Sequence, residues 1–436
     1  MHLSRSLLSL HLVAAAAAAA VLLPTSPSLS QPIPPSQDAW YTAPSGWNGS
    51  APGTILRIRQ APGNLTSEAQ IANASAAYNI LYRTTDSHFQ PSWAVTTLFI
   101  PKTEYLSPSG RLALLSFQFA YDSADVDSSP SYGIYNDLAV TVPSLGVPSQ
   151  TATINLALGN GWFVQTPDFE GPQAAFGAVV QEGHATLDAQ RAVLSLAKTV
   201  LAVEPDKVTV ALWGYSGGSV ATAAAAELQV QYAPELTLAG AASGGLVTNL
   251  STTLDGFNGS AIAGDLVSSV LGLMAEYPAA DAYIRSRLVP ATAAKFLGTY
   301  NRTLLNATAY WDNVDVYSYF IGGREDLFNS SVMKKIFAYD TVLGVYGVPT
   351  TPLYFYKAVG DEYCPVRETD ALVNQYSATN PDITYQRNTV GGHVDELING
   401  QPGAFEWLWG IFNESHIPLA ACSIQNVTVN ISSTNS

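Results

Sequence analysis

The chain has 436 residues, of which 47% are hydrophobic and only 12% are charged, so it can bury a large apolar core. Its 34 acidic residues against 19 lysines and arginines give a formal net charge of −15. This balance excludes a nucleic-acid-binding surface built on basic residues, and it leaves little attraction to anionic lipid headgroups.

The N-terminus has the order of charged, apolar and small residues that is typical of a secretory signal peptide. Arg5 precedes an apolar run from Leu7 to Leu23, and small or polar residues follow it. We therefore expect residues 1–30 to be a signal peptide and the mature protein to be secreted and extracellular. A membrane anchor is the alternative, but the run contains His11 and is short for a full span.

The acceptor sequence for N-glycosylation, Asn-x-Ser/Thr, occurs eleven times. So many acceptors in an exported chain predict a glycoprotein, with each acceptor on a surface loop or at a helix end. The acceptors are Asn48, Asn64, Asn73, Asn249, Asn258, Asn301, Asn306, Asn329, Asn413, Asn426 and Asn430.

Short apolar runs alternate with helical patterns along the chain, as is typical of a mostly parallel sheet covered by helices on both faces. The expected strands are 93–100, 112–119, 162–166, 208–213, 238–242, 353–358 and 383–386. The expected helices are 185–202, one directly after residue 216, and 403–412. The sequence predicts an α/β fold whose core is divided between residues 31–248 and 349–436.

The most informative motif is Gly214-Tyr-Ser-Gly-Gly218, which is the only match to G-x-S-x-G in the chain. It lies between the apolar run 208–213 and an alanine-rich segment of high helix propensity. A serine in such a turn is held in a strained conformation with its hydroxyl above the sheet, and glycines avoid clashes between strand and helix. We therefore predict Ser216 to be a nucleophile; a tight turn with a bystander serine is the alternative.

Residues 249–348 interrupt the alternation of strands and helices. Leu266, Val270 and Leu273 recur at i, i+4 and i+7, as expected of an amphipathic helix. Because the segment falls between the serine motif and the next core strand, we expect a helical cap over the site rather than a separate domain. A helical excursion without a role as a lid is the alternative.

A nucleophilic serine needs a base, which in this architecture follows it in the chain after an acid. Only His393 and His416 lie beyond Ser216. His393 is in a glycine-rich loop after the last expected strand, where it can reach the carboxyl edge of the sheet. His416 lies past the last helix, beside a glycosylation acceptor. We therefore predict His393 as the base.

The acid that orients the base is predicted to be Asp361. It follows the strand 353–358 closely, so its carboxylate belongs to the same edge of the sheet, where it would fix the imidazole tautomer. Glu362, Asp340 and Asp370 are the alternatives, and Glu362 is the serious one.

Acyl transfer also needs hydrogen-bond donors for the developing oxyanion. The N–H after the nucleophile, here that of Gly217, is the usual first donor. We expect the second from residues 120–125, where the strand 112–119 ends.

The two cysteines, Cys364 and Cys422, belong to a chain bound for an oxidising compartment. We expect a Cys364–Cys422 disulfide that holds the C-terminal tail beside the active-site face; two free buried thiols are the alternative. No further histidine or carboxylate cluster stands out that would complete a metal site with them, so we expect none.

Three further segments resemble, together with the serine motif, the fungal secretory lipase family of the α/β-hydrolase superfamily. They are Ser116-Phe-Gln-Phe-Ala-Tyr-Asp122 with Pro130-Ser-Tyr132, Pro167-Asp-Phe-Glu-Gly171, and Gly183-His-Ala-Thr-Leu-Asp-Ala-Gln-Arg191. The resemblance covers most of the mature chain, and it implies an α/β-hydrolase fold with a helical cap between the nucleophile and the acid.

Residue by residue, the resemblance implies Ser216, Asp361 and His393 as a catalytic triad, and Asp122 and Gly217 as the oxyanion donors. Only a protonated carboxyl or a backbone N–H can donate, so we expect Asp122 to be held neutral in an apolar site. The position of Cys364 differs from the cysteine positions of the family, so the family's disulfide pattern does not carry over.

Together these features predict a secreted serine lipase that hydrolyses acylglycerols or other long-chain esters through an acyl-enzyme. Its partner would be a lipid or ester substrate at a lipid–water interface, with no cofactor, metal or nucleic acid. An esterase or acyltransferase for short-chain or soluble esters is the first alternative. A non-catalytic glycoprotein of the hydrolase fold is the second.

Overall fold

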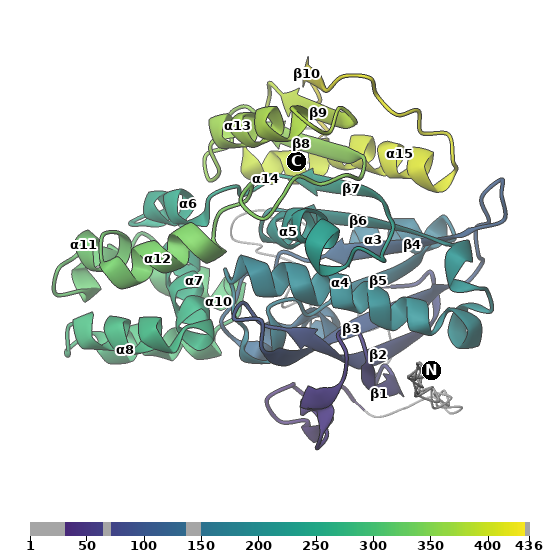
Figure 1. Cartoon of the computed structure of the whole chain (residues 1–436). Helices are drawn as coiled ribbons and strands as arrows, with labels where there is room; N and C mark the ends of the chain where they lie inside the picture. The colour runs from purple at the N-terminus through teal and green to yellow at the C-terminus, as the bar shows by residue number, and fades with distance from the viewer. Residues whose placement is uncertain (1–30, 64–70, 137–149, 432–436) are drawn as a thin grey trace, which may run out of the picture.

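The computed structural model describes residues 31–63, 71–136 and 150–431, and Figure 1 shows them as a sheet with helices packed around it. The expected signal peptide and the acceptor Asn64 lie outside the described residues. The strands are β1 (Ile55–Gln60), β2 (Ala74–Thr85), β3 (Pro91–Pro101), β4 (Leu112–Gln118), β5 (Phe163–Pro167), β6 (Val208–Tyr215), β7 (Leu238–Gly244), β8 (Leu353–Ala358), β9 (Ile383–Asn388) and β10 (Ser423–Val427). The α-helices are α2 (Pro130–Gly133), α3 (Thr151–Gly159), α4 (Val179–Ser195), α5 (Gly217–Tyr232), α6 (Leu250–Phe257), α7 (Ala263–Glu276), α8 (Pro278–Arg287), α9 (Ala293–Leu297), α10 (Leu304–Trp311), α11 (Arg324–Phe328), α12 (Ser331–Asp340), α13 (Val366–Ser377), α14 (His393–Asn399) and α15 (Gln401–Phe412).

The strands form a ten-stranded sheet in the order β1-β2-β3-β5-β4-β6-β7-β8-β9-β10. The seven strands from β5 to β10 in this order pair in parallel, whereas β1, β2 and β3 form an antiparallel edge. The α/β fold with a mostly parallel sheet is therefore confirmed. The sequence analysis missed β1 and β10 because neither contains a fully buried residue, so neither has the apolar run that marks β6.

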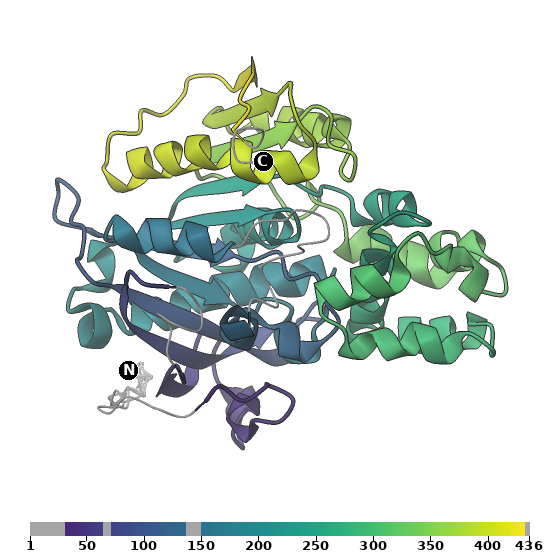
Figure 2. The same ribbon diagram turned by 180° about the vertical axis from the view of Figure 1, so that it is seen from behind.

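Helices cover both faces of the sheet. Helices α4 and α5 lie on one face, and α3 and α15 lie on the other (Figures 1 and 2). Helix α4 packs so closely on α5 that a Cβ at Gly183 would lie 2.7 Å from Leu228 and 3.1 Å from the Ala224 side chain. This contact fixes α5, the helix that begins directly after Ser216.

The predicted start of α4 at Ala185 is wrong, since the helix begins at Val179. Its first turns contain Gln181, Glu182 and His184, which are all buried. A pattern that assigns polar residues to the surface cannot identify such a turn, because here the polar side chains face inward.

Helices α6 to α12 occupy the expected cap segment and lie together to one side of the sheet (Figures 1 and 2). Backbone hydrogen bonds join the two ends of this segment where it leaves and rejoins the core. Leu250 N–H donates to the carbonyl of Thr341 at 2.9 Å, and Leu343 N–H donates to that of Thr248, also at 2.9 Å. We call residues 249–342 the cap and these two hydrogen bonds its stem.

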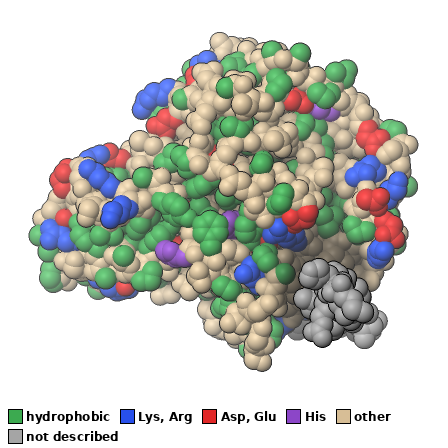
Figure 3. Space-filling model, in the orientation of Figure 1, with side chains coloured by type: hydrophobic (Ala, Val, Ile, Leu, Met, Phe, Trp, Pro, Cys, Tyr) green, Lys and Arg blue, Asp and Glu red, His purple; other side chains and the backbone are tan. Residues whose placement is uncertain are grey.

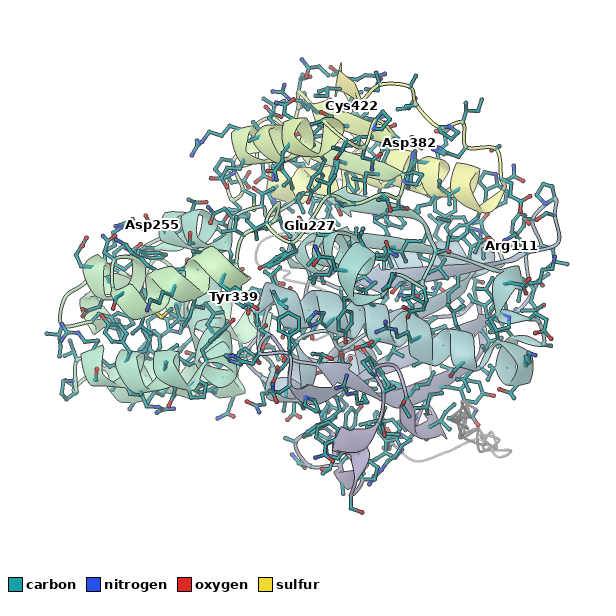
Figure 4. The ribbon with its side chains drawn as sticks, in the orientation of Figure 1. Arg111, Glu227, Asp255, Tyr339, Asp382 and Cys422 are labelled. Carbon is teal, nitrogen blue, oxygen red and sulfur yellow. The ribbon has the colours of Figure 1, made fainter. Side chains whose placement is uncertain are left out.

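The predicted Cys364–Cys422 disulfide is wrong, because both cysteines are free thiols. Cys364 follows β8 and is buried at the carboxyl edge of the sheet, whereas Cys422 directly precedes β10 (Figure 4). Because β8, β9 and β10 run parallel, the start of β10 lies at the opposite edge from the end of β8. Strands of five or six residues separate these edges by roughly 17–20 Å, well beyond the reach of a disulfide.

The described glycosylation acceptors differ in exposure. Six are exposed, and the side chains of the other four take part in hydrogen bonds within the protein. The exposed acceptors are Asn48, Asn301, Asn306, Asn329, Asn426 and Asn430, and the bonded ones are Asn73, Asn249, Asn258 and Asn413. Glycosylation stays a prediction, best placed on the exposed group. Among the described residues, no helix has the length and apolar character that a membrane crossing requires.

Candidate active site

Ser216 lies in the sharp turn between β6 and α5. Its backbone has φ 50° and ψ −125°, a conformation that non-glycine residues rarely adopt. The neighbouring glycines make the turn feasible: a Cβ at Gly214 would lie 2.2 Å from the carbonyl oxygen of Gly218, and one at Gly218 would lie 2.0 Å from that of Gln118. The motif therefore forms the strand-to-helix elbow that its glycines predict.

The structure brings Ser216, His393 and Asp361 together from three separate parts of the chain. The Nε2 atom of His393 lies 2.8 Å from Ser216 Oγ, and its Nδ1 atom lies 2.8 Å from Asp361 Oδ2. His393 begins α14 after β9, and Asp361 follows β8. The arrangement is a hydroxyl, an imidazole and a carboxylate joined by two hydrogen bonds, which is the geometry of a nucleophile, its base and the group that orients the base.

The carboxylate of Asp361 is buried and fully engaged. Besides His393 it accepts hydrogen bonds from the backbone N–H groups of Tyr363 (3.0 Å) and Cys364 (2.8 Å), and the buried Nζ of Lys357 lies 3.0 Å from its Oδ2. Burial by itself raises the pKa of Asp361, but His393, Lys357 and the Cys364 N–H together hold it below its ordinary value. The group is therefore an anion beside the imidazole.

His393 is also held through its backbone. Its N–H donates to Glu362 Oε2 at 2.9 Å, and its carbonyl accepts from the Tyr215 hydroxyl at 2.6 Å. Glu362, the serious alternative for the acid, thus contacts the main chain of His393 and not the ring nitrogen that Asp361 occupies. The sequence analysis missed Lys357 and Tyr215, although a lysine inside the apolar run Leu353–Ala358 is a signal of a buried partner charge.

The remaining candidates for the acid, Asp340 and Asp370, lie away from the serine, and so does the second histidine, His416. Asp340 is buried at the base of the cap, where it accepts hydrogen bonds from Val180 N–H and the Tyr277 hydroxyl. Asp370 faces Arg387 at 3.5 Å, and His416 faces Asp382 at 2.9 Å. None of these three groups contacts Ser216 or the ring of His393.

Asp122 lies directly beside Gly217. A Cβ at Gly217 would come within 1.9 Å of Asp122 Oδ1, so this glycine leaves the room that the carboxyl occupies. Asp122 has φ 39° and is buried, and its Oδ1 has no hydrogen-bond partner among the described residues. Burial raises the pKa of Asp122 to about 7, against the opposing influence of His393. This raised pKa favours the protonated form of Asp122 in acidic solution, and its role as an oxyanion donor stays a prediction.

The cluster opens into a cavity of about 100 Å³ whose wall is mostly apolar. The core contributes Ala120, Phe176, Val220, Val247, Val394 and Leu397. The cap contributes Leu250, Thr253, Leu254, Phe257, Ile262, Asp265, Leu304 and Thr308. The cavity thus lies between core and cap, with Ser216 and His393 in its wall.

A second apolar hollow lies where the cap meets the tip of the β2–β3 hairpin, near Tyr339 (Figures 3 and 4). It contains Phe89 and Tyr277 and none of the residues of the serine cluster.

Two of the resembling motifs position the Asp122 loop. Asp168 accepts from the N–H and the hydroxyl of Ser131, at 2.8 and 2.5 Å, and this joins the second motif to α2. The next residues approach the loop itself, since Glu170 N–H donates to the Tyr121 hydroxyl at 2.8 Å. These hydrogen bonds therefore hold the loop that contains Asp122 in place.

Asp361, Cys364 and His393 bring an oxygen, a sulfur and a nitrogen ligand atom within 4.8 Å of one another. The carboxylate and the imidazole already bond each other, and the Lys357 ammonium lies against the same carboxylate. A cation would have to displace both contacts, so the group is better described as part of the serine cluster.

Comparison with known proteins agrees with this geometry. The sequence profile of the secretory lipase family ("Secretory lipase") matches residues 139–417. The chain is 45% identical over 416 residues to a probable trichothecene esterase of Stachybotrys chartarum, covering 95% of this chain and 84% of the relative. It is 44% identical over 419 residues to a trichothecene C-3 esterase of Fusarium sporotrichioides, covering 93% and 90%. Its structure resembles that of Candida antarctica lipase A with a TM-score of 0.80 at 26% identity, covering 91% of this chain and 90% of the other.

The fold and these relatives define a carboxylic ester hydrolase of the α/β-hydrolase class. Within that class, the chain belongs to the secretory lipase family.

Proposed function

We propose that this chain is an exported serine esterase in which Ser216 attacks the ester carbonyl. The observation that carries the proposal is the hydrogen-bonded series Asp361–His393–Ser216, with 2.8 Å at each step, at a strained elbow that opens into the cavity. His393 accepts the serine proton and returns it to the departing alcohol, and Asp361 stabilises the imidazolium. Water then hydrolyses the acyl-enzyme by the same route.

The oxyanion of the tetrahedral intermediate would be held by Gly217 N–H and by Asp122. Gly217 is the first residue of α5, so its N–H has no partner within the helix and the helix dipole favours negative charge beside it. Asp122 lies against Gly217 and is uncharged below pH 7. A neutral carboxyl donates a hydrogen bond to an oxyanion, whereas a carboxylate repels it.

For the substrate, we propose a short acyl ester of a compact, oxygenated, apolar alcohol. The small cavity beside Ser216 and the two relatives named as trichothecene esterases support this choice, which the sequence analysis places second to a long-chain lipase. Hydrolysis of long-chain acylglycerols is the second candidate, and the apolar cap lining and the likeness to lipase A favour it. In both cases the cap would shape the pocket for the substrate.

A chain-length series distinguishes the two candidates. We expect kcat/KM of the secreted protein to be higher for p-nitrophenyl acetate than for p-nitrophenyl palmitate, and a trichothecene 3-acetate to release acetate. A rate that rises from acetate to palmitate would establish the lipase instead. Labelling with diethyl p-nitrophenyl phosphate should add one diethylphosphoryl group to the peptide that contains Ser216, and a label elsewhere would contradict the assignment of the nucleophile.

The role of Asp122 gives a separate prediction. Asp122→Ala should lower kcat by about 10²- to 10³-fold, because it removes one oxyanion donor. Asp122→Asn keeps a donor at every pH and tolerates the positive φ, so it should retain activity and lose the decline above pH 7. The measurement is kcat from pH 4 to 9 for the three proteins. An unchanged pH profile for Asp122→Asn, or full activity for Asp122→Ala, would assign the second donor to the backbone N–H.

A further inference from the structure

Many of the polar groups that line the catalytic cavity have hydrogen-bond partners within the protein. Ser216 and His393 bond each other, and Gln150 bonds the backbone of Ala120 through both ends of its amide. Glu182 accepts from Gly177 N–H at 2.9 Å, and the hydroxyl of Thr308 donates to the carbonyl of Leu304 one turn earlier at 2.8 Å. Asp122 belongs to the proposed oxyanion site. Two side chains that line the cavity from the cap each have a shielded oxygen without a hydrogen-bond partner among the described residues, namely Thr253 and Asp265. Of the two, only Asp265 is acidic.

Asp265 lies in the first turn of cap helix α7 and faces the cavity. Its Oδ1 atom is shielded from solvent and has no hydrogen-bond partner among the described residues. Cap residues around it, such as Ile262 and Leu304, are apolar. A shielded polar atom without a partner is unfavourable, because it has lost its hydrogen bonds to water and gained none in the protein.

Asp265 lines the same cavity as Asp122, Tyr363 and His393. It is close enough to Asp122 for the two carboxyls to interact, and close enough to Tyr363 to influence its hydroxyl. Tyr363 in turn lies against the ring of His393, with 5.3 Å between ring centroids. Asp265 therefore faces, from the cap, the cavity that also contains the proposed oxyanion group and the base.

The buried carboxyl of Asp265 favours its neutral form. Burial and the neighbouring Asp122 raise the pKa of Asp265 well above its usual range. A neutral carboxyl is both a donor and an acceptor, so it pairs well with a hydroxyl or a carbonyl and has no preference for a cation.

We propose that Asp265 is a specificity-determining residue that hydrogen-bonds a hydroxyl group of the substrate's alcohol portion. The inference rests on the proposed esterase function and narrows its substrate to esters whose alcohol bears a free hydroxyl near the ester oxygen. A site that holds a polar group for this purpose rejects the analogue that lacks the hydroxyl, because the carboxyl is then left unpaired in the complex.

Cyclohexyl acetate and the monoacetates of 1,2-, 1,3- and 1,4-cyclohexanediol test the proposal, because they vary only the presence and position of the hydroxyl. We expect kcat/KM for at least one monoacetate to exceed that for cyclohexyl acetate by about tenfold or more. Asp265→Leu should remove this preference and leave cyclohexyl acetate hydrolysed at least as fast. Asp265→Asn keeps a donor and an acceptor and should retain most of the preference.

Thr308→Val is the matched control, because Thr308 also lines the cavity from the cap but is satisfied within its own helix. Thr308→Val should leave unchanged the ratio of kcat/KM for the monoacetates to kcat/KM for cyclohexyl acetate. Two results for Asp265→Leu would overturn the proposal and assign Asp265 to the stability of α7. One is an equal loss of kcat/KM on all four esters. The other is a lower melting temperature with an unchanged ratio of kcat/KM between the monoacetates and cyclohexyl acetate. If no ester is hydrolysed in a Ser216-dependent way, the proposed function itself fails.

Discussion

Ser216→Ala is expected to lower kcat for ester hydrolysis by about 10⁴- to 10⁶-fold while the protein stays folded. The substitution removes the attacking oxygen, whereas His393, Asp361 and the proposed oxyanion donors keep their places. The strained backbone conformation at position 216 is about as unfavourable for alanine as for serine, so the melting temperature should change little. Initial rates on p-nitrophenyl acetate, together with thermal melting of both proteins, provide the measurement.

Ser219 supplies the control for this experiment. It is buried three residues further along α5, and its hydroxyl donates to the carbonyl of Ser216 at 2.5 Å. Ser219→Ala removes a neighbouring hydroxyl without touching the proposed nucleophile, so kcat should fall by less than about tenfold. If Ser216→Ala retained more than a tenth of the wild-type rate, the nucleophile would have to be another group.

The second large effect is a loss of stability as the pH rises from about 5 to about 8. Burial raises the pKa of Asp168 to about 7, and that of Glu182 and Glu276 to about 8; the pKa of buried Glu170 is raised well above its usual range. Such carboxyls bind more protons in the folded than in the unfolded chain between their two pKa values, so the free energy of unfolding falls with pH across that window.

Two buried groups, His184 and Asp361, work in the opposite direction at lower pH. Burial lowers the pKa of His184 to about 4, and Asp361 has a pKa below its ordinary value, so both contributions grow as the pH rises through the acidic range. They are complete by about pH 6.5, the ordinary pKa of histidine. Above that pH, only the buried carboxyls with raised pKa values still change the free energy of unfolding. We therefore expect the melting temperature to fall by on the order of 10 °C between pH 6 and pH 8, measured by calorimetry at constant ionic strength.

Glu182→Gln tests the cause of this trend. The amide oxygen can still accept from Gly177 N–H but no longer titrates, so the decline of the melting temperature above pH 6 should become shallower. Glu104→Gln changes an exposed glutamate and should leave the slope unaltered. A melting temperature that is constant or rises from pH 6 to pH 8 in the wild-type protein would contradict the expectation.

The central part of the fold could be predicted from the sequence because its signals are local. Strand β6 is apolar throughout and is followed by glycines and an alanine-rich helix, so both its type and its position are readable. Strand β2 could not be identified in this way, because Asn79 and Thr84 are buried in it and break the apolar pattern. The start of α4 was missed for the same reason. In both places tertiary contacts with polar partners decide the structure, and a single sequence contains no record of them.

In the candidate site, too, the features with a local sequence signal could be predicted and those that depend on tertiary contacts could not. Chain order and the position after a strand indicated Ser216, Asp361 and His393, which the structure joins by hydrogen bonds. The disulfide failed because the distance between Cys364 and Cys422 depends on the direction of β10, a strand that the sequence did not reveal. Asp265 was missed because an acid at the start of a helix is common, and only its missing partner sets it apart.

The stem of the cap has a consequence for how this family can diversify. The chain leaves the core after β7 and returns before β8, two strands that are neighbours in the sheet, and the two ends are clasped to each other by backbone hydrogen bonds. A segment whose ends meet in this way can be exchanged or lengthened without altering the spacing of the strands beneath it. The serine and the histidine come from the core, whereas a third of the residues that line the cavity come from the cap. Replacing residues 249–342 by a relative's segment would therefore change which substrates are accepted and leave the hydrolytic residues in place.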